Sequence, residues 1–115
     1  MLSQKLRRFL AQLIAKVRHT NGMDNGEAAA LLKDHLEAYR RRSYHDLVTL
    51  LGKPQVTELR GASGVTYQVE VGVHWDARPG GALRVLGSID DGGWRAFSPL
   101  CDDFILAPDG RFVGE

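Results

Sequence analysis

Apolar and polar residues alternate strictly along one stretch of eleven residues, positions 65–75. Every second position carries Val, Tyr or Trp, and the positions between them carry Thr, Gln, Glu, Gly and His. A period of two is typical of a β-strand with one buried face and one wetter face. At about 3.3 Å per residue the strand would extend roughly 35 Å, long enough to be the centre of a small sheet.

The first half of the chain has the period of helices instead. Residues 1–22 carry apolar side chains at spacings of three and four, which predicts an amphipathic helix and leaves open whether it is a detachable arm. Asp24 and Ser43 are each followed three residues later by an acid, the spacing that caps a helix start. Gly52 and the proline two residues later end the helical region. We therefore expect residues 24–52 to be helical.

After residue 54 the pattern is that of short strands joined by turns. Besides the long strand, strands are expected at residues 55–60, 82–89 and 94–98, and residues 104–106 and 111–113 would form either a small terminal hairpin or a loop. Helices followed by a run of strands indicate an α+β fold. The prediction is one domain over residues 1–115, with two to three N-terminal helices packed on one face of a four- to five-stranded antiparallel meander sheet formed by residues 55–113.

Composition agrees with one globular domain. The 115 residues are 43% apolar and 25% charged, which is ordinary, and a chain of this length can bury a core without disulfides. The single cysteine, Cys101, has acidic neighbours, which favours an unreactive, partly buried thiol. Because no internal disulfide can form, we expect a reducing compartment and a cytoplasmic protein. No stretch approaches the roughly 20 apolar residues of a membrane span.

Charge is unevenly distributed behind the net value of +1. Residues 1–23 contain five basic residues and no acid, whereas residues 76–115 contain seven acids and four arginines. The excess is too small for a dedicated nucleic-acid binder. The three arginines at 40–42 complement a helix dipole, since they lie in the last turn of the second helix. Nucleic-acid contact through the basic helices therefore ranks as a second alternative.

Two resemblances bear on the expected function. The segments 89–97 (IDDGGWRAF) and 108–115 (PDGRFVGE) are similar to the tail of a group of small uncharacterised bacterial proteins, which implies a bacterial cytoplasmic protein and no particular mechanism. Residues 43–54 and the strands after them resemble in layout the β-lactamase inhibitory protein and the small lipoprotein of the outer-membrane assembly machinery. That layout implies helices on one side of an antiparallel sheet and a function in binding other proteins.

The candidate chemistry lies on the surface. The chain has no HExxH, CxxC, GxSxG, Walker or GxGxxG pattern, and we expect no catalytic residue, metal or cofactor. We predict a small soluble protein-interaction module of inhibitor, immunity or accessory type, which binds another protein, or itself through the N-terminal helix. The open face of the sheet or the 76–81 loop would bind the partner. The candidate binding residues are Gln68, Glu70, His74, Asp76, Arg78, Arg84, Trp94 and Arg95.

A small metal-dependent hydrolase using His74, Asp76 and Glu70 is the first alternative. Hard cations need several converging oxygen ligands. Asp90 and Asp91 do not extend such a site, because the hairpin would pair Asp90 near the start of the long strand. An Asp-Asp-Gly-Gly string also has a sufficient backbone reason to occur in a tight turn. We therefore favour a protein without enzymatic activity.

Overall fold

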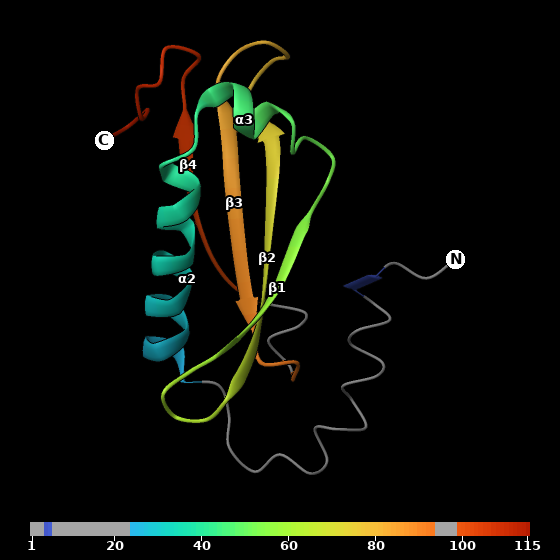
Figure 1. The fold of residues 1–115 in the computed structure, drawn as a ribbon, viewed down its shortest axis with the longest axis vertical. Coiled ribbons are helices and arrows are strands. Elements are labelled where there is room, and N and C mark those ends of the chain that lie inside the picture. The colour runs from blue at the N-terminus through green and yellow to red at the C-terminus, as the bar shows by residue number, and fades with distance from the viewer. Residues whose placement is uncertain (1–3, 6–23, 94–98) are drawn as a thin grey trace.

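The computed structural model describes residues 4–5, 24–93 and 99–115. Two helices precede four strands in this part of the chain: α2 (Asn25–Arg40), α3 (Tyr44–Val48), β1 (Gln55–Arg60), β2 (Thr66–Trp75), β3 (Leu83–Asp90) and β4 (Leu100–Leu106). The strands form one antiparallel sheet in the order β1-β2-β3-β4 (Figure 1). The predicted α+β class and antiparallel meander are confirmed.

Some predicted elements differ in position. The helix expected over residues 1–22 lies outside the described residues except for 4–5, so the predicted number of helices is only loosely matched. The strand expected at 94–98 also lies outside them. The fourth strand begins directly after Pro99, which has no N–H for the ladder, and not at residue 104. Of the terminal hairpin or loop expected at 104–106 and 111–113, the structure has a single bridge between Leu106 and Phe112.

Both helices begin at the predicted caps. Asp24 Oδ1 accepts a hydrogen bond from the N–H of Glu27 at 3.0 Å, and Ser43 Oγ accepts one from the N–H of Asp46 at 3.1 Å. These bonds satisfy donors that have no partner inside a helix. The reciprocal half of the first capping box is absent, because the Glu27 side chain hydrogen-bonds to Ser63 and Tyr67 of the β1–β2 region instead.

The core lies between α2, α3 and one face of the sheet. The alternation of β2 buries Tyr67, Val69, Val71 and Val73 on that face, as predicted. The other members of the core come from both helices and from β3 and β4: Ala28, Leu32, Leu36, Tyr39, Leu47, Leu83, Val85, Ile89, Phe104 and Leu106. The four from α2 recur every three or four residues, the spacing of one helix face.

Two leucines of helix α2 pack directly over a glycine of β3. A Cβ on Gly87 would lie 2.9 Å from Cδ1 of Leu32 and 3.1 Å from Cδ2 of Leu36. The missing side chain therefore leaves the space that these two leucines fill. Gly87 sets the distance between helix and sheet at this point.

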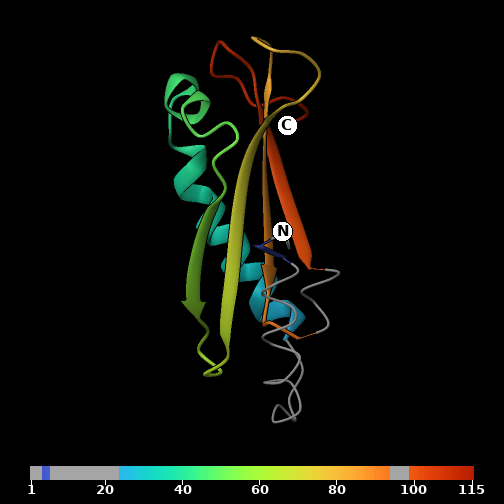
Figure 2. The same ribbon diagram turned by 90° about the vertical axis from the view of Figure 1, so that its right-hand side faces the viewer.

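The helices pack mainly over β3 and β4, and not over β1. Helix α2 contacts β3 and β4, whereas β1 is the strand farthest from it (Figure 1). Helix α3 lies at the end of the sheet where β2 finishes and β3 starts (Figure 2). Tyr44 OH donates to the carbonyl of Gly81 at 2.6 Å and fixes the hairpin between those strands to α3. Neither α2 nor α3 has the length and apolar content that crossing a membrane requires.

Candidate functional site

The sheet face opposite α2 carries four of the predicted binding residues. Gln68, Glu70 and His74 occupy alternate positions of β2, and Arg84 of β3 lies directly opposite His74. Their side chains project away from the core, because the residues between them on β2 are the buried ones. No described helix or strand lies over this face, which we call the open face.

Two large apolar side chains are exposed on the open face. Val56 on β1 is 43% exposed and Leu86 on β3 is 38% exposed. Leu86 lies between Gly72 of β2 and Asp103 of β4 in the sheet register, so the residue directly opposite it on β2 has no side chain. A Cβ on Gly72 would lie 2.8 Å from Nε2 of His74, which shows that the imidazole leans over this glycine.

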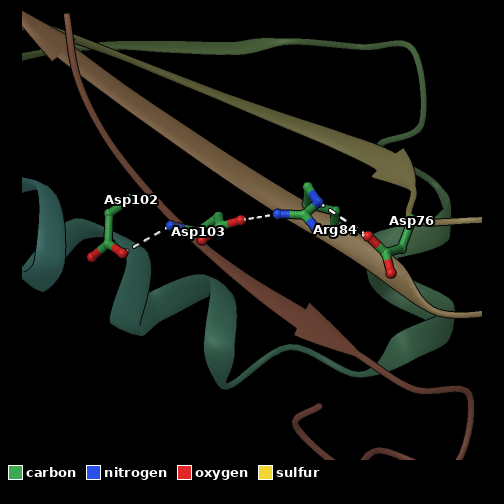
Figure 3. A network of polar contacts seen from close by, with 4 residues as sticks. All are labelled: Asp76, Arg84, Asp102 and Asp103. Carbon is green, nitrogen blue, oxygen red and sulfur yellow. Dashed lines mark hydrogen bonds and ion pairs between the residues drawn. The ribbon is translucent and has the colours of Figure 1, made fainter. Parts of the chain in front are cut away.

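Arg84 of β3 links β4 to Asp76, the residue that follows β2, at the end of the open face (Figure 3). Arg84 donates from Nε and Nη2 to Oδ1 of Asp76, at 3.1 and 2.9 Å, and from Nη1 to Oδ2 of Asp103. The N–H of Asp103 donates to Oδ1 of Asp102 at 2.8 Å. These contacts raise the pKa of Arg84 above its ordinary value, with the Asp76 hydrogen bond as the largest cause.

The open face is acidic. Its accessible described residues include two arginines, Arg60 and Arg84, and four acids: Glu58, Glu70, Asp76 and Asp103. The positive charge of Arg84 is already compensated by two of those carboxylates. The face therefore has the opposite sign from the chain as a whole, which carries +1.

The 76–81 loop adjoins the open face at Asp76. Arg78 is exposed in this loop, and its carbonyl accepts from the N–H of Gly81 at 3.1 Å. Gly80 has a backbone φ of +82°, a conformation that residues other than glycine rarely adopt. The remaining two predicted binding residues, Trp94 and Arg95, lie outside the described residues.

The acidic turn after β3 has the predicted backbone role. Asp90 Oδ1 accepts from the N–H of Gly92 at 2.8 Å, and Asp91 Oδ1 accepts from the N–H of Gly93 at 2.9 Å. Asp90 pairs with Gln68 and lies far along the strand from His74, also as predicted. The Asp90 side chain is only 1% exposed, so it is a buried part of the turn.

The structure offers little support for a metal site. Within residues 4–5, 24–93 and 99–115, no three His, Cys, Asp or Glu side chains are grouped in a way that could hold a metal ion. Oδ1 of Asp76, a proposed ligand, is engaged by Arg84. Cys101 is exposed on β4, contrary to the expected partial burial, because an edge strand leaves its outward side chains in solvent.

A second polar cluster ties the C-terminal residues to α2. Arg40 Nη1 donates to Oε2 of Glu115 at 3.0 Å, and Nη2 donates to Oε1. The guanidinium carbon lies 5.2 Å from the ring centre of Phe104 and 4.2 Å from that of Phe112. Arg40 lowers the pKa of Glu115 through this hydrogen bond. A cavity of about 440 Å³ lies beside the cluster, lined by Lys33, Leu36, Glu37, Arg40, Asp102, Asp103, Phe104 and Glu115.

A third cluster joins the start of α2 to the β1–β2 turn. The Glu27 carboxylate accepts from the N–H of Ser63 at 3.0 Å, from its hydroxyl at 2.6 Å and from Tyr67 OH at 2.9 Å. These bonds lower the pKa of Glu27, with the Ser63 hydroxyl as the largest cause. Burial and then the Glu27 bond raise the pKa of Tyr67 to about 12. Gly61 has no side chain where this carboxylate lies, since a Cβ there would be 2.5 Å from Glu27 Cδ.

Two polar side-chain atoms are buried without a hydrogen-bond partner in the described part of the chain, Nε2 of His35 and Oε1 of Gln68. Burial lowers the pKa of His35, and the nearby Asp34 partly opposes that effect. His35 lies against Tyr39 with ring centres 5.7 Å apart, so it belongs to the edge of the core. Gln68 is the one of the two that lies on the open face.

Comparisons with family models, with curated proteins and with solved structures found no match. The functional inference therefore depends on the geometry of the described residues. Of the clusters above, the open face contains four of the predicted residues and the exposed apolar side chains of Val56 and Leu86. The sequence alone did not identify Asp103 as part of it, because its contact with Arg84 follows only from the β3–β4 register.

Proposed function

We propose that the chain is a protein-interaction module that binds a partner protein through the open face of its sheet. The observation that carries the proposal is the exposure of Leu86 and Val56 on a sheet face over which no described element lies. Protein interfaces combine an apolar centre with a polar rim. Leu86 would contribute to that centre, and Glu70, His74 and Arg84 would contribute to the rim.

Charge indicates the kind of partner surface. Glu58 and Glu70 project from the open face and make no ion pair with a described residue. Arg84 already has two carboxylate partners, so it offers little to an acidic partner. A partner with a basic surface around an apolar centre would fit this face, and opposite potentials would speed their encounter. An inhibitor, an immunity protein or an accessory subunit could each use such a surface.

The 76–81 loop extends the proposed surface. Asp76 belongs both to the loop and to the Arg84 network, so a partner that covers Leu86 lies close to the loop as well. Tyr44 holds the Gly81 end of the loop through its 2.6 Å hydrogen bond. Exposed Arg78 lies between these two fixed points and supplies a side-chain type that is enriched at binding hot spots.

The test is recovery of a partner by the full chain and its loss in one variant. The wild-type protein is used for affinity purification from its native source, and the accompanying proteins are identified by mass spectrometry. Leu86→Arg places a large cation in the centre of the open face, and we expect it to lose the partner. Ala38→Arg adds the same side chain at an exposed position of α2, and we expect it to retain the partner.

Circular dichroism and thermal unfolding confirm that both variants are folded before binding is compared. A partner that Leu86→Arg retains as fully as Ala38→Arg would contradict binding through the open face. Recovery of nothing but the chain itself, at every salt concentration, would contradict the interaction function altogether.

A further inference from the structure

The two edges of the described sheet differ. Beyond β4, the C-terminal residues close part of the edge, because Phe112 bridges to Leu106 and the N–H of Val113 donates to the carbonyl of Ile105 at 2.9 Å. Beyond β1, no described residue continues the ladder (Figures 1 and 2). An edge strand with unpaired backbone groups is a template for another strand.

The backbone of β1 shows which groups are available. The N–H of Gly61 donates to the carbonyl of Val65 at 2.9 Å, so Gly61 is bonded toward β2. In an antiparallel ladder, alternate residues bond to the same neighbour. The N–H and C=O groups of Val56, Glu58 and Arg60 therefore point away from β2, toward the edge at which no described residue pairs.

The side chains of the same edge are self-complementary. Glu58 and Arg60 are exposed on the open face, two positions apart, and neither makes an ion pair with a described residue. Leu59 lies between them, half-buried on the opposite face. A negative and a positive charge thus lie at equal distances on either side of Leu59.

We propose that β1 pairs antiparallel with β1 of a second copy, with the two-fold axis at Leu59. This register puts Glu58 of each copy opposite Arg60 of the other, and both residues have outward backbone groups. An axis at Glu58 would oppose two glutamates, and an axis at Arg60 two arginines. An axis at Thr57 would bring Arg60 opposite Pro54, which has no N–H to donate. Of these four axes, only the one at Leu59 both places opposite charges face to face and lets every paired residue form its backbone hydrogen bonds.

The pairing makes one eight-stranded sheet from the two four-stranded ones. The open faces of both copies then lie on the same side, because the paired β1 strands continue each ladder. The two proposed surfaces share Val56 and Glu58 of β1, but their tests differ, because Leu86→Arg changes a residue two strands away from β1 and the charge swap changes β1 alone. Loss of the partner in Leu86→Arg and loss of the dimer in the charge-swap variants are therefore separate results.

A charge swap tests the register. Sedimentation equilibrium of the purified full chain, from micromolar to millimolar concentration, measures the dimer dissociation constant. In a dimer of Glu58→Arg, an arginine at position 58 faces Arg60 of the other copy at two symmetric places. In a dimer of Arg60→Glu, a glutamate at position 60 faces Glu58 of the other copy at the same two places. We expect each to raise the dissociation constant about tenfold or more, since like charges directly opposite one another destabilise strand pairs. The double variant restores opposite charges and the wild-type constant. Glu70→Arg changes the same charge on the central strand β2 and leaves the constant unchanged.

Amide hydrogen exchange locates the contact independently. We expect the N–H groups of Glu58 and Arg60 to become more protected as protein concentration rises, while those of Thr57 and Leu59 are protected at every concentration. A chain that stays monomeric throughout the range overturns the proposal. So does a dimer whose constant ignores the charge swap, or one that forms without protecting the outward amides.

Discussion

Adding one methyl group at Gly87 tests the packing of the helix on the sheet. The Gly87→Ala side chain would lie 2.9 Å from Leu32 Cδ1 and 3.1 and 3.3 Å from the two Cδ atoms of Leu36. Both leucines are buried, at 1% and 3% exposure, so neither can swing into solvent. The methyl group can be accommodated only if α2 moves away from β3 or the leucines leave their preferred rotamers.

The expected cost is the difference between two effects. Overpacking a well-filled core costs about 1–3 kcal/mol. Replacing glycine by alanine inside a strand returns about 0.5–1 kcal/mol, because the unfolded chain loses freedom. Gly87→Ala should therefore lower the free energy of unfolding by roughly 1 kcal/mol, within a range of about 0–2.5 kcal/mol.

Gly72→Ala is the matched control. Gly72 lies on the neighbouring strand β2, but the nearest neighbours of its added Cβ are all atoms of the His74 imidazole, an exposed side chain that can rotate away. This variant keeps the gain from replacing glycine by alanine in a strand and avoids the overpacking. Its free energy of unfolding should therefore equal that of the wild type or slightly exceed it. Urea denaturation followed by circular dichroism gives both free energies.

A double-mutant cycle identifies the neighbour responsible. Leu32→Val removes the Cδ atoms nearest to the new methyl group, so it should cost less in the Gly87→Ala background than in the wild type. Equal stability of the two alanine variants, with no coupling between positions 87 and 32, would refute the claim that Gly87 sets the approach of α2.

Three further predictions concern the polar clusters. Tyr67, with a pKa of about 12 in the folded protein and 10.0 as its ordinary value, contributes stability that is complete below pH 10 and falls by about 2–3 kcal/mol as pH rises toward 12. Denaturation of wild type and Tyr67→Phe across that range should show the wild type losing its advantage; a constant difference argues against the raised pKa. Glu27, whose pKa is lowered, contributes stability that is present above pH 4.5 and lost as pH falls through its folded pKa, so Glu27→Gln should be less stable at pH 7 and lose less on acidification. Arg40→Lys loses the paired hydrogen bonds of the guanidinium, so nuclear magnetic resonance titration should show the pKa of Glu115 rising toward 4.5; an unchanged value means that Arg40 is not its cause.

Local patterns in the sequence predicted local structure well. The alternation of positions 65–75 placed Gln68, Glu70 and His74 on one face of β2, because side-chain direction in a strand follows from position alone. The helix caps at Asp24 and Ser43 were also predicted, since each depends on residues three positions apart.

Contacts between distant segments could not be predicted in this way. Asp103 reaches Arg84 only because the register pairs β4 with β3, whereas the sequence pattern indicated no strand between residues 99 and 103. An edge strand tolerates such charges on its exposed positions, so β4 extends back to Leu100. The ion pair between Arg40 and Glu115 joins residues 75 positions apart, a separation at which no sequence spacing indicates contact.

Carboxyl-group footprinting of the isolated complex tests the central claim most directly. A carbodiimide labels exposed carboxylates of the chain alone and of the chain with its recovered partner, and mass spectrometry measures each site. Binding through the open face predicts that labelling of Glu58 and Glu70 falls in the complex, while Asp34 and Glu37 on the exposed side of α2 keep their labelling. Protection of the two helix residues, with Glu58 and Glu70 unchanged, would contradict the proposed binding face.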